Sequence, residues 1–119
     1  MLKYIIIIVL AAMIVYFGHS KSSVEHFYVA NSNIAGQGLF CSDPQAKGSR
    51  LFKALDLDHS IRDEVRKVNH CDRPNTYLVK EDDGWWVYAK RNHVKDEELS
   101  IDYRDTPDFI RKPEPEWTC

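Results

Sequence analysis

Several absences limit what this 119-residue chain can be. Its 16 lysines and arginines are outnumbered by 18 aspartates and glutamates, giving a net charge of −2. A nucleic-acid-binding domain normally carries a basic stripe, so we expect no direct nucleic-acid binding, and the slight acidity suits a basic peptide partner. The sequence also has no internal repeats and no long run with helical periodicity. Short apolar stretches separated by turn residues instead indicate a mostly β domain.

Cysteine is scarce, and none of it falls in a C-x-x-C pair. The three cysteines are Cys41, Cys71 and Cys119, an odd number that makes a poor disulfide framework. The prediction is three free thiols. The isolated His59 and His93 lack the spacing of metal ligands, so we expect them to be solvated or half-buried and expect no metal site.

Only one long hydrophobic segment is present, at the N-terminus. Residues 4–17 form an unbroken apolar run of 14, with Lys3 before it and Lys21 after it. That length is short for a spanning helix, which needs about 20 residues. With Leu2 and Gly18 added at its ends, the run is long enough for a short anchor. Residues 1–20 are interpreted in this way, as a signal-anchor that places residues 4–18 in a membrane. The alternatives are a cleaved signal peptide ending at Ser20, and a buried helix.

The remaining chain divides into a linker at 21–25, one domain at 26–104 and a proline-containing tail at 105–119. Expected strands cover residues 27–30, 38–40, 51–55, 76–81, 85–89 and 99–102. The Asp83-Gly84 pair favours a tight hairpin turn between the fourth and fifth strands. Ser60 followed by Asp63 predicts the start of a helix of one or two turns.

Three segments carry a resemblance to a known family. Residues 33–40 read N-I-A-G-Q-G-L-F, similar to a G-x-G followed by an apolar pair. Residues 66–75 read R-K-V-N-H-C-D-R-P-N, similar to R-F-I-N-H-S-C-x-P-N. Residues 96–103 read D-E-E-L-S-I-D-Y, similar to G-E-E-L-T-x-D-Y. Taken in this order, the three segments resemble the SET domain family, and the chain looks like a minimal, viral-like member.

This resemblance implies a fold and an activity. The fold is a mostly β, β-clip-type arrangement of short sheets with a C-terminal pseudoknot, preceded by one hydrophobic N-terminal helix. The activity is S-adenosylmethionine-dependent methylation of protein lysines, with histones as the suggested substrate class. Tyr103 would be the catalytic residue, because its phenol oxygen can contact both the methyl group and the lysine amine. The residues expected to bind the cofactor are Gly36, Gln37, Gly38, Asn69, His70 and Tyr103.

Two departures from the family pattern matter. Asp72 stands where relatives often have a zinc-binding cysteine, and the tail holds only Cys119, so a zinc site is not expected. Only 20 residues separate Gly48 from Asn69, where relatives insert much of the substrate groove. Either the groove is open, or a partner or the tail completes it. The candidates for closing the substrate channel are Tyr77, Phe109 and Trp117.

The sequence therefore leaves three hypotheses for function. The leading one is a membrane-anchored protein-lysine N-methyltransferase. The alternative is a catalytically decayed SET-fold module with a binding or structural role at a membrane or virion. A third is a small secreted β domain without a cofactor.

Overall fold

The computed structural model describes residues 26–119. The N-terminal hydrophobic segment and the linker predicted from the sequence lie outside this part of the chain. Among the described residues, no helix has the length and apolar character needed to cross a membrane.

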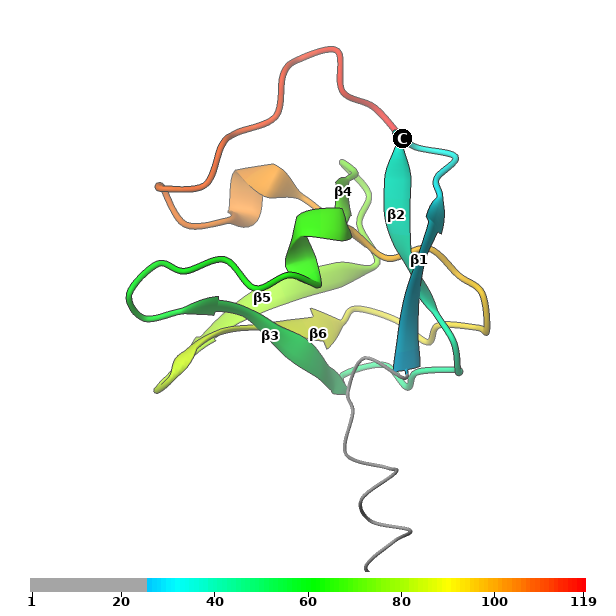
Figure 1. The fold of residues 1–119 in the computed structure, drawn as a ribbon, viewed down its shortest axis with the longest axis horizontal. Coiled ribbons are helices and arrows are strands. Elements are labelled where there is room, and N and C mark those ends of the chain that lie inside the picture. The colour runs from blue at the N-terminus through cyan, green and yellow to red at the C-terminus, as the bar shows by residue number, and fades with distance from the viewer. Residues whose placement is uncertain (1–25) are drawn as a thin grey trace, which may run out of the picture.

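The described part is a mostly β structure of short strands arranged in three small sheets (Figure 1). The elements in chain order are β1 (Phe27–Asn31), β2 (Gln37–Cys41), β3 (Arg50–Asp56), the 3₁₀ turn η2 (Val65–Lys67), β4 (Asn69–His70), β5 (Thr76–Glu81), β6 (Gly84–Ala89), β7 (Ser100–Ile101) and the 3₁₀ turn η3 (Tyr103–Asp105). All the expected strands are present within one or two residues of their predicted limits. The tail after η3 forms no strand or α-helix, as expected.

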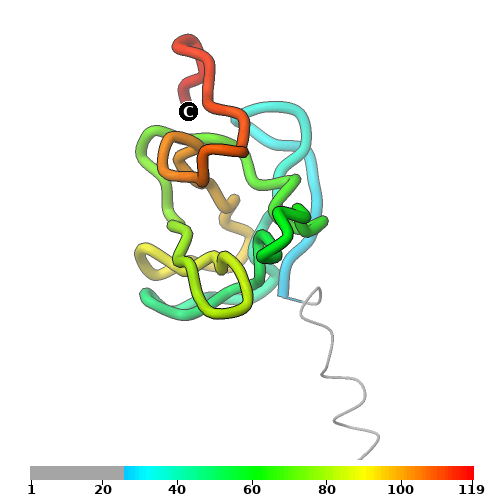
Figure 2. Tube along the Cα trace, turned by 90° about the vertical axis from the view of Figure 1, so that its left-hand side faces the viewer, coloured from blue at the N-terminus to red at the C-terminus, as the bar shows by residue number. Residues whose placement is uncertain are grey.

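Each sheet joins different parts of the chain. Strands β1 and β2 form an antiparallel hairpin, and β3, β6 and β5 form an antiparallel sheet in that order. The third sheet is the parallel pair β4 and β7, which brings Asn69 opposite Ser100 although 30 residues separate them in the sequence. In the tube of Figure 2, the chain runs around a common centre.

The predicted hairpin of β5 and β6 is confirmed, but Gly84 has a second role. It belongs to β6 and has a φ of +143°, which a residue with a side chain rarely adopts. A Cβ atom at this position would lie 2.2 Å from the carbonyl oxygen of Leu55. Glycine therefore both permits the turn and lets β3 approach β6 closely.

The helix predicted from Ser60 is wrong. Ile61 pairs with Leu55 as an isolated bridge, and the backbone N–H of Arg62 donates to the oxygen of Ala54. Because the backbone of residues 61 and 62 pairs with β3, the only helical turn between β3 and β4 is η2. Pairing with a neighbouring strand overrides the local capping signal.

The hydrophobic core lies where the three sheets meet. Its residues come from β1, β2, β3, β6 and β7 and from the positions just before β4 and β7: Phe27, Leu39, Cys41, Phe52, Ala54, Leu55, Val68, Val87, Leu99 and Ile101. Val68 and Ile101 flank Asn69, His70 and Tyr103 in the sequence. Their burial therefore holds those three residues at the edge of the core.

Candidate active site

The three sequence segments that carry the family resemblance lie next to one another. Residues 97–99 run beside β2, where the backbone N–H of Leu99 donates to Leu39 and that of Cys41 donates to Glu97. One residue later the chain enters β7 and pairs with β4. Backbone from residues 37–41, 69–70 and 97–101 is thus gathered at one place.

Asn75 joins two of these segments by side-chain hydrogen bonds. It is buried, its Nδ2 donates to the carbonyl oxygen of Glu98 at 2.8 Å, and its Oδ1 accepts from the N–H of Ser100 at 2.8 Å. The hydroxyl of Thr76 also donates to the oxygen of Ser100. The Asn75 amide therefore fixes β7 against the end of the Asn-His motif.

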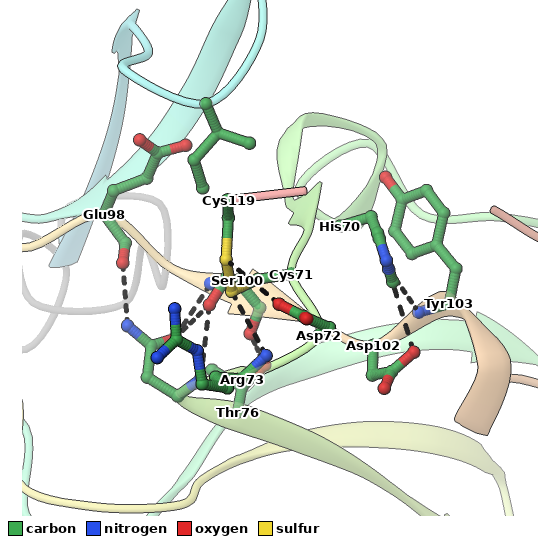
Figure 3. Close-up of a disulfide and its surroundings, with 12 residues drawn as sticks. His70, Cys71, Asp72, Arg73, Thr76, Glu98, Ser100, Asp102, Tyr103 and Cys119 are labelled. Atoms are coloured by element: carbon green, nitrogen blue, oxygen red, sulfur yellow. Dashed lines mark hydrogen bonds and ion pairs between the residues drawn. A yellow bond between two sulfur atoms is a disulfide. The ribbon is translucent and has the colours of Figure 1, made fainter. Parts of the chain in front are cut away.

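His70 and Tyr103 are held together through the backbone. The N–H of Tyr103 donates to Nδ1 of His70 at 3.0 Å, and the two ring centroids are 5.3 Å apart (Figure 3). Since Nδ1 accepts this bond, a neutral ring carries its proton on Nε2. The phenol of Tyr103 donates to the carbonyl oxygen of Val68 at 2.7 Å. Both ends of the tyrosine are therefore fixed.

Two ionisable groups at this place have shifted pKa values. Burial raises the pKa of the Tyr103 phenol, so it stays neutral well above neutral pH. The Arg104 guanidinium hydrogen-bonds to the Asp102 carboxylate and lowers its pKa, with a smaller contribution from His70. The Asp102 carboxylate also accepts from the N–H of Arg104 and so caps η3.

A cavity of about 360 Å³ opens beside these residues. Its walls come from the β1–β2 turn, from β4, from Tyr103 and from the tail: Ile34, Ala35, Asn69, His70, Tyr103, Glu116, Trp117 and Thr118. In Figure 1 the tail, coloured orange to red, arches from η3 toward the β1–β2 end of the molecule. We call this the first cavity.

A second cavity, of about 570 Å³, is also lined by Tyr103. Its lining is mainly apolar and comes from β3, the segment before β4, β5, β7 and the tail: Ala54, Leu55, Ile61, Val65, Arg66, Leu78, Ile101, Tyr103, Thr106, Phe109, Ile110 and Arg111. Tyr103 lines both cavities. Tail residues line both cavities as well.

The structure brings most of the predicted site residues together. Asn69, His70, Tyr103 and Trp117 line the first cavity, and Phe109 lines the second. Tyr77 lines neither cavity. It lies on β5, is 40% exposed, and stacks on Tyr88.

The three residues of the predicted glycine segment, Gly36, Gln37 and Gly38, are not among those that line the first cavity. Gly36 is exposed with a φ of +48°, which favours glycine, and Gln37 is exposed. Gly38 is buried, and a Cβ there would lie 2.4 Å from an oxygen of the Glu98 carboxylate. The lack of a side chain at 38 therefore admits Glu98.

The prediction of three free thiols is wrong for two of them. Cys71 and Cys119 form a disulfide with a Cα–Cα distance of 5.2 Å, an ordinary separation for such a bond (Figure 3). The tail folds back to the residue that follows His70, a long-range contact that cysteine spacing does not reveal. Cys41 is free and buried, and desolvation, with a smaller effect of Glu97, raises the pKa of its thiol to about 11.

The expectation for His93 is also wrong, because its side chain is completely buried. Its Nδ1 lies 3.0 Å from the Glu97 carboxylate, and its Nε2 lies 2.9 Å from the carbonyl oxygen of Asn75. Nδ1 also lies 3.8 Å from the sulfur of Cys41, so both ring nitrogens have polar neighbours in the core. His59 is exposed, as expected, and stacks on Phe109.

Fold and site together define a class: a small β domain that gathers distant backbone around one tyrosine shared by two cavities. Comparison with known families agrees, since the model of the SET domain matches residues 20–104. The chain therefore belongs to the SET domain family, whose members are generally protein-lysine methyltransferases.

Solved structures share this fold, and one of them illustrates the match. It is the crystal structure of a candidate histone methyltransferase of Plasmodium falciparum, with 22% sequence identity and a TM-score of 0.50. The match covers 66% of this chain and 92% of that chain. At this identity the likeness concerns the fold alone. No curated protein sequence matches the chain.

Proposed function

We propose that this protein is an S-adenosylmethionine-dependent protein-lysine N-methyltransferase. The observation that carries the proposal is that Tyr103 lines both cavities. A methyl donor in the first cavity and a lysine side chain in the second would meet at one phenol oxygen.

The residues of the first cavity fit the cofactor. Small-molecule sites commonly occupy 300–1,000 Å³ (the first cavity has about 360 Å³) and combine apolar walls with a few polar groups. Trp117 and Ile34 offer apolar surface for a purine ring. Asn69 and the His70 segment offer polar groups for an amino-acid end, in agreement with the family resemblance. When bound, the cofactor supplies a positively charged sulfonium with a transferable methyl group.

The second cavity suits the other reactant. Its apolar walls match the four-carbon stem of lysine, and removal from water favours the neutral, nucleophilic amine by lowering its pKa. Tyr103 is held by Val68 and His70, so its oxygen has a fixed position. It can align the amine and contact the polarised methyl without taking the proton itself, because its own pKa is raised.

Finer features belong to the same proposal. Gly36, Gln37 and Gly38 would shape the cofactor side of the site, and Phe109 and Trp117 would close the channel. Tyr77 is the weakest of the proposed channel residues, since it lines neither cavity. The pseudoknot is supported by the parallel pairing of β4 with β7 and by the cross-link through Asn75.

A basic, histone-like peptide remains the proposed substrate, supported by the net charge of −2. Arg66 and Arg111 also line the second cavity, so peptides with an acidic residue beside the lysine belong in the same test. We also propose domains at 1–20, 21–25, 26–104 and 105–119, with a membrane tether through residues 4–18. Sequence composition supports the tether.

The test uses the full-length chain in detergent with radiolabelled S-adenosylmethionine. Core histones and a lysine peptide library with acidic and basic flanks are the acceptors. Label transferred to lysine by the wild-type chain, and strongly reduced with Tyr103→Phe, is the expected result. Cofactor binding without any transfer would favour the alternative of a decayed SET-fold module.

A further inference from the structure

Glu98 makes contacts that the proposed mechanism does not use. One of its carboxylate oxygens accepts from the hydroxyl of Ser32 at 2.6 Å and from Nδ2 of Asn69 at 3.0 Å. In Figure 3 its carboxylate points toward the β1–β2 hairpin, away from the disulfide. Glu98 does not itself line either cavity.

The surroundings of Asn69 fix the orientation of its amide. Nδ2 lies 3.0 Å from the carbonyl oxygens of Ala35 and Gln37, as well as from Ser32 Oγ and Glu98 Oε2. The two carbonyls and the carboxylate can only accept, so the NH₂ group must face them. Within residues 26–119, Asn69 Oδ1 accepts no hydrogen bond. The amide therefore offers an acceptor, and not a donor, to a ligand in the first cavity.

We propose that Glu98 is a positioning residue, which locks the Asn69 amide so that Oδ1 receives the cationic α-ammonium of the cofactor's amino-acid end. Without the carboxylate, only neutral acceptors at Ser32, Ala35 and Gln37 hold the NH₂ group, so the amide turns more readily to face the cavity with NH₂, where it would oppose an ammonium. The inference rests on the proposed function, because it assumes that the first cavity binds this cofactor.

Gly38 makes room for the Glu98 carboxylate that holds Asn69. A methyl group at 38 would overlap the Glu98 carboxylate, with 2.4 Å to Oε2 and 2.9 Å to Cδ. The atoms in the way are the end of a flexible side chain, so Gly38→Ala would displace the carboxylate before it disturbed the backbone. Gly38→Ala should therefore reproduce the effect of losing Glu98.

The experiment compares two ligands by calorimetry on the full-length chain in detergent. S-adenosylhomocysteine contains the α-ammonium, whereas 5′-methylthioadenosine lacks the whole amino-acid end. Glu98→Ala is expected to weaken binding of S-adenosylhomocysteine by about 10- to 100-fold, the value of a hydrogen bond to a charged group. Binding of 5′-methylthioadenosine should not change. A general loss of structure would weaken both ligands equally and would overturn the proposal.

Three further variants separate orientation from other effects. Glu98→Gln keeps an acceptor for Asn69 without the charge and should restore most of the affinity. A loss as large as that of Glu98→Ala would overturn the proposal, because the charge would then act on the ligand and not through Asn69. Gly38→Ala combined with Glu98→Ala should bind no more weakly than Glu98→Ala alone. Glu81→Ala serves as the matched control, because it removes a carboxylate that pairs with Arg50 within the sheet of β3, β6 and β5.

The outcomes also distinguish this inference from the proposed function. If wild-type protein binds neither ligand, the proposed function fails. If wild-type protein binds S-adenosylhomocysteine and Glu98→Ala binds it equally well, only the role of Glu98 is overturned.

Discussion

Replacing Cys119 with serine removes the covalent link between the tail and the residue that follows His70. The disulfide joins positions separated by 48 residues. Closing a loop of that length lowers the entropy of the unfolded chain by about 14 cal/mol/K, which corresponds to about 4 kcal/mol at 25 °C. In a domain of this size each kcal/mol shifts the melting temperature by about 4–8 °C, so Cys119→Ser should lower it by about 15–30 °C.

A second effect of the same substitution concerns the first cavity. Glu116, Trp117 and Thr118 form one of its walls and immediately precede Cys119. Besides the disulfide, Trp117 is held by an edge contact with Tyr103 and by the Arg111 guanidinium over its ring. Such contacts are worth about 1 kcal/mol each. Loss of the disulfide should therefore also weaken binding of S-adenosylhomocysteine.

The assays are thermal unfolding and calorimetry, with and without a dithiol reductant that converts the disulfide to two thiols. Cys71→Ser, Cys119→Ser and the double variant should have the same melting temperature, because each removes the same bond. The reductant should lower the wild type to that value and leave the double variant unchanged. The reasoning is refuted if reduced wild type and Cys119→Ser melt and bind like the oxidised protein.

Three other substitutions have definite expected outcomes. Tyr103→Phe should lower kcat by about 100-fold through lost alignment while cofactor affinity stays nearly unchanged, which steady-state kinetics and calorimetry check together. Asp102→Asn should lower the free energy of unfolding at neutral pH. The folded-state pKa of Asp102 lies below the ordinary aspartate pKa of about 3.9, so the difference in free energy from wild type should shrink as the pH falls below that value. Urea unfolding across that pH range measures it, and a pH-independent difference would contradict the assignment. His93→Leu should destabilise the protein by about 1–3 kcal/mol, because it removes a completely buried ring that hydrogen-bonds to the Asn75 carbonyl; a lower urea midpoint would show it.

Apolar alternation and turn residues predicted the strands, and short motifs predicted part of the candidate site. Both signals come from residues that are close together in the sequence. The hairpin at 76–89 follows from alternating apolar residues and the Asp-Gly turn, and it appears within one residue of its expected place. Asn69 and Tyr103 could be found because family motifs surround them. Their common position follows from the pairing of β4 with β7.

What sequence did not reveal depends on contacts between distant residues. Ser60 has the composition of a helix cap, but neighbouring Ile61 pairs with β3. His93 has no ligand-like spacing, yet Glu97 and Asn75 meet both of its nitrogens in the core. The carboxylate of Glu98 reaches Ser32 across 66 positions. In each case the partner, and not the residue type, decides the role.

The tail contributes to both cavities through contacts of the same long-range kind. Only 20 residues lie between Gly48 and Asn69, too few for the longer insertion expected from the family resemblance. Phe109, Ile110 and Arg111 nevertheless wall the second cavity, and residues 116–118 wall the first. Because the disulfide anchors this one segment next to His70, a single covalent link supports walls of both cavities. The two cavities share both Tyr103 and the tail, so a substitution that releases the tail should alter both of them together.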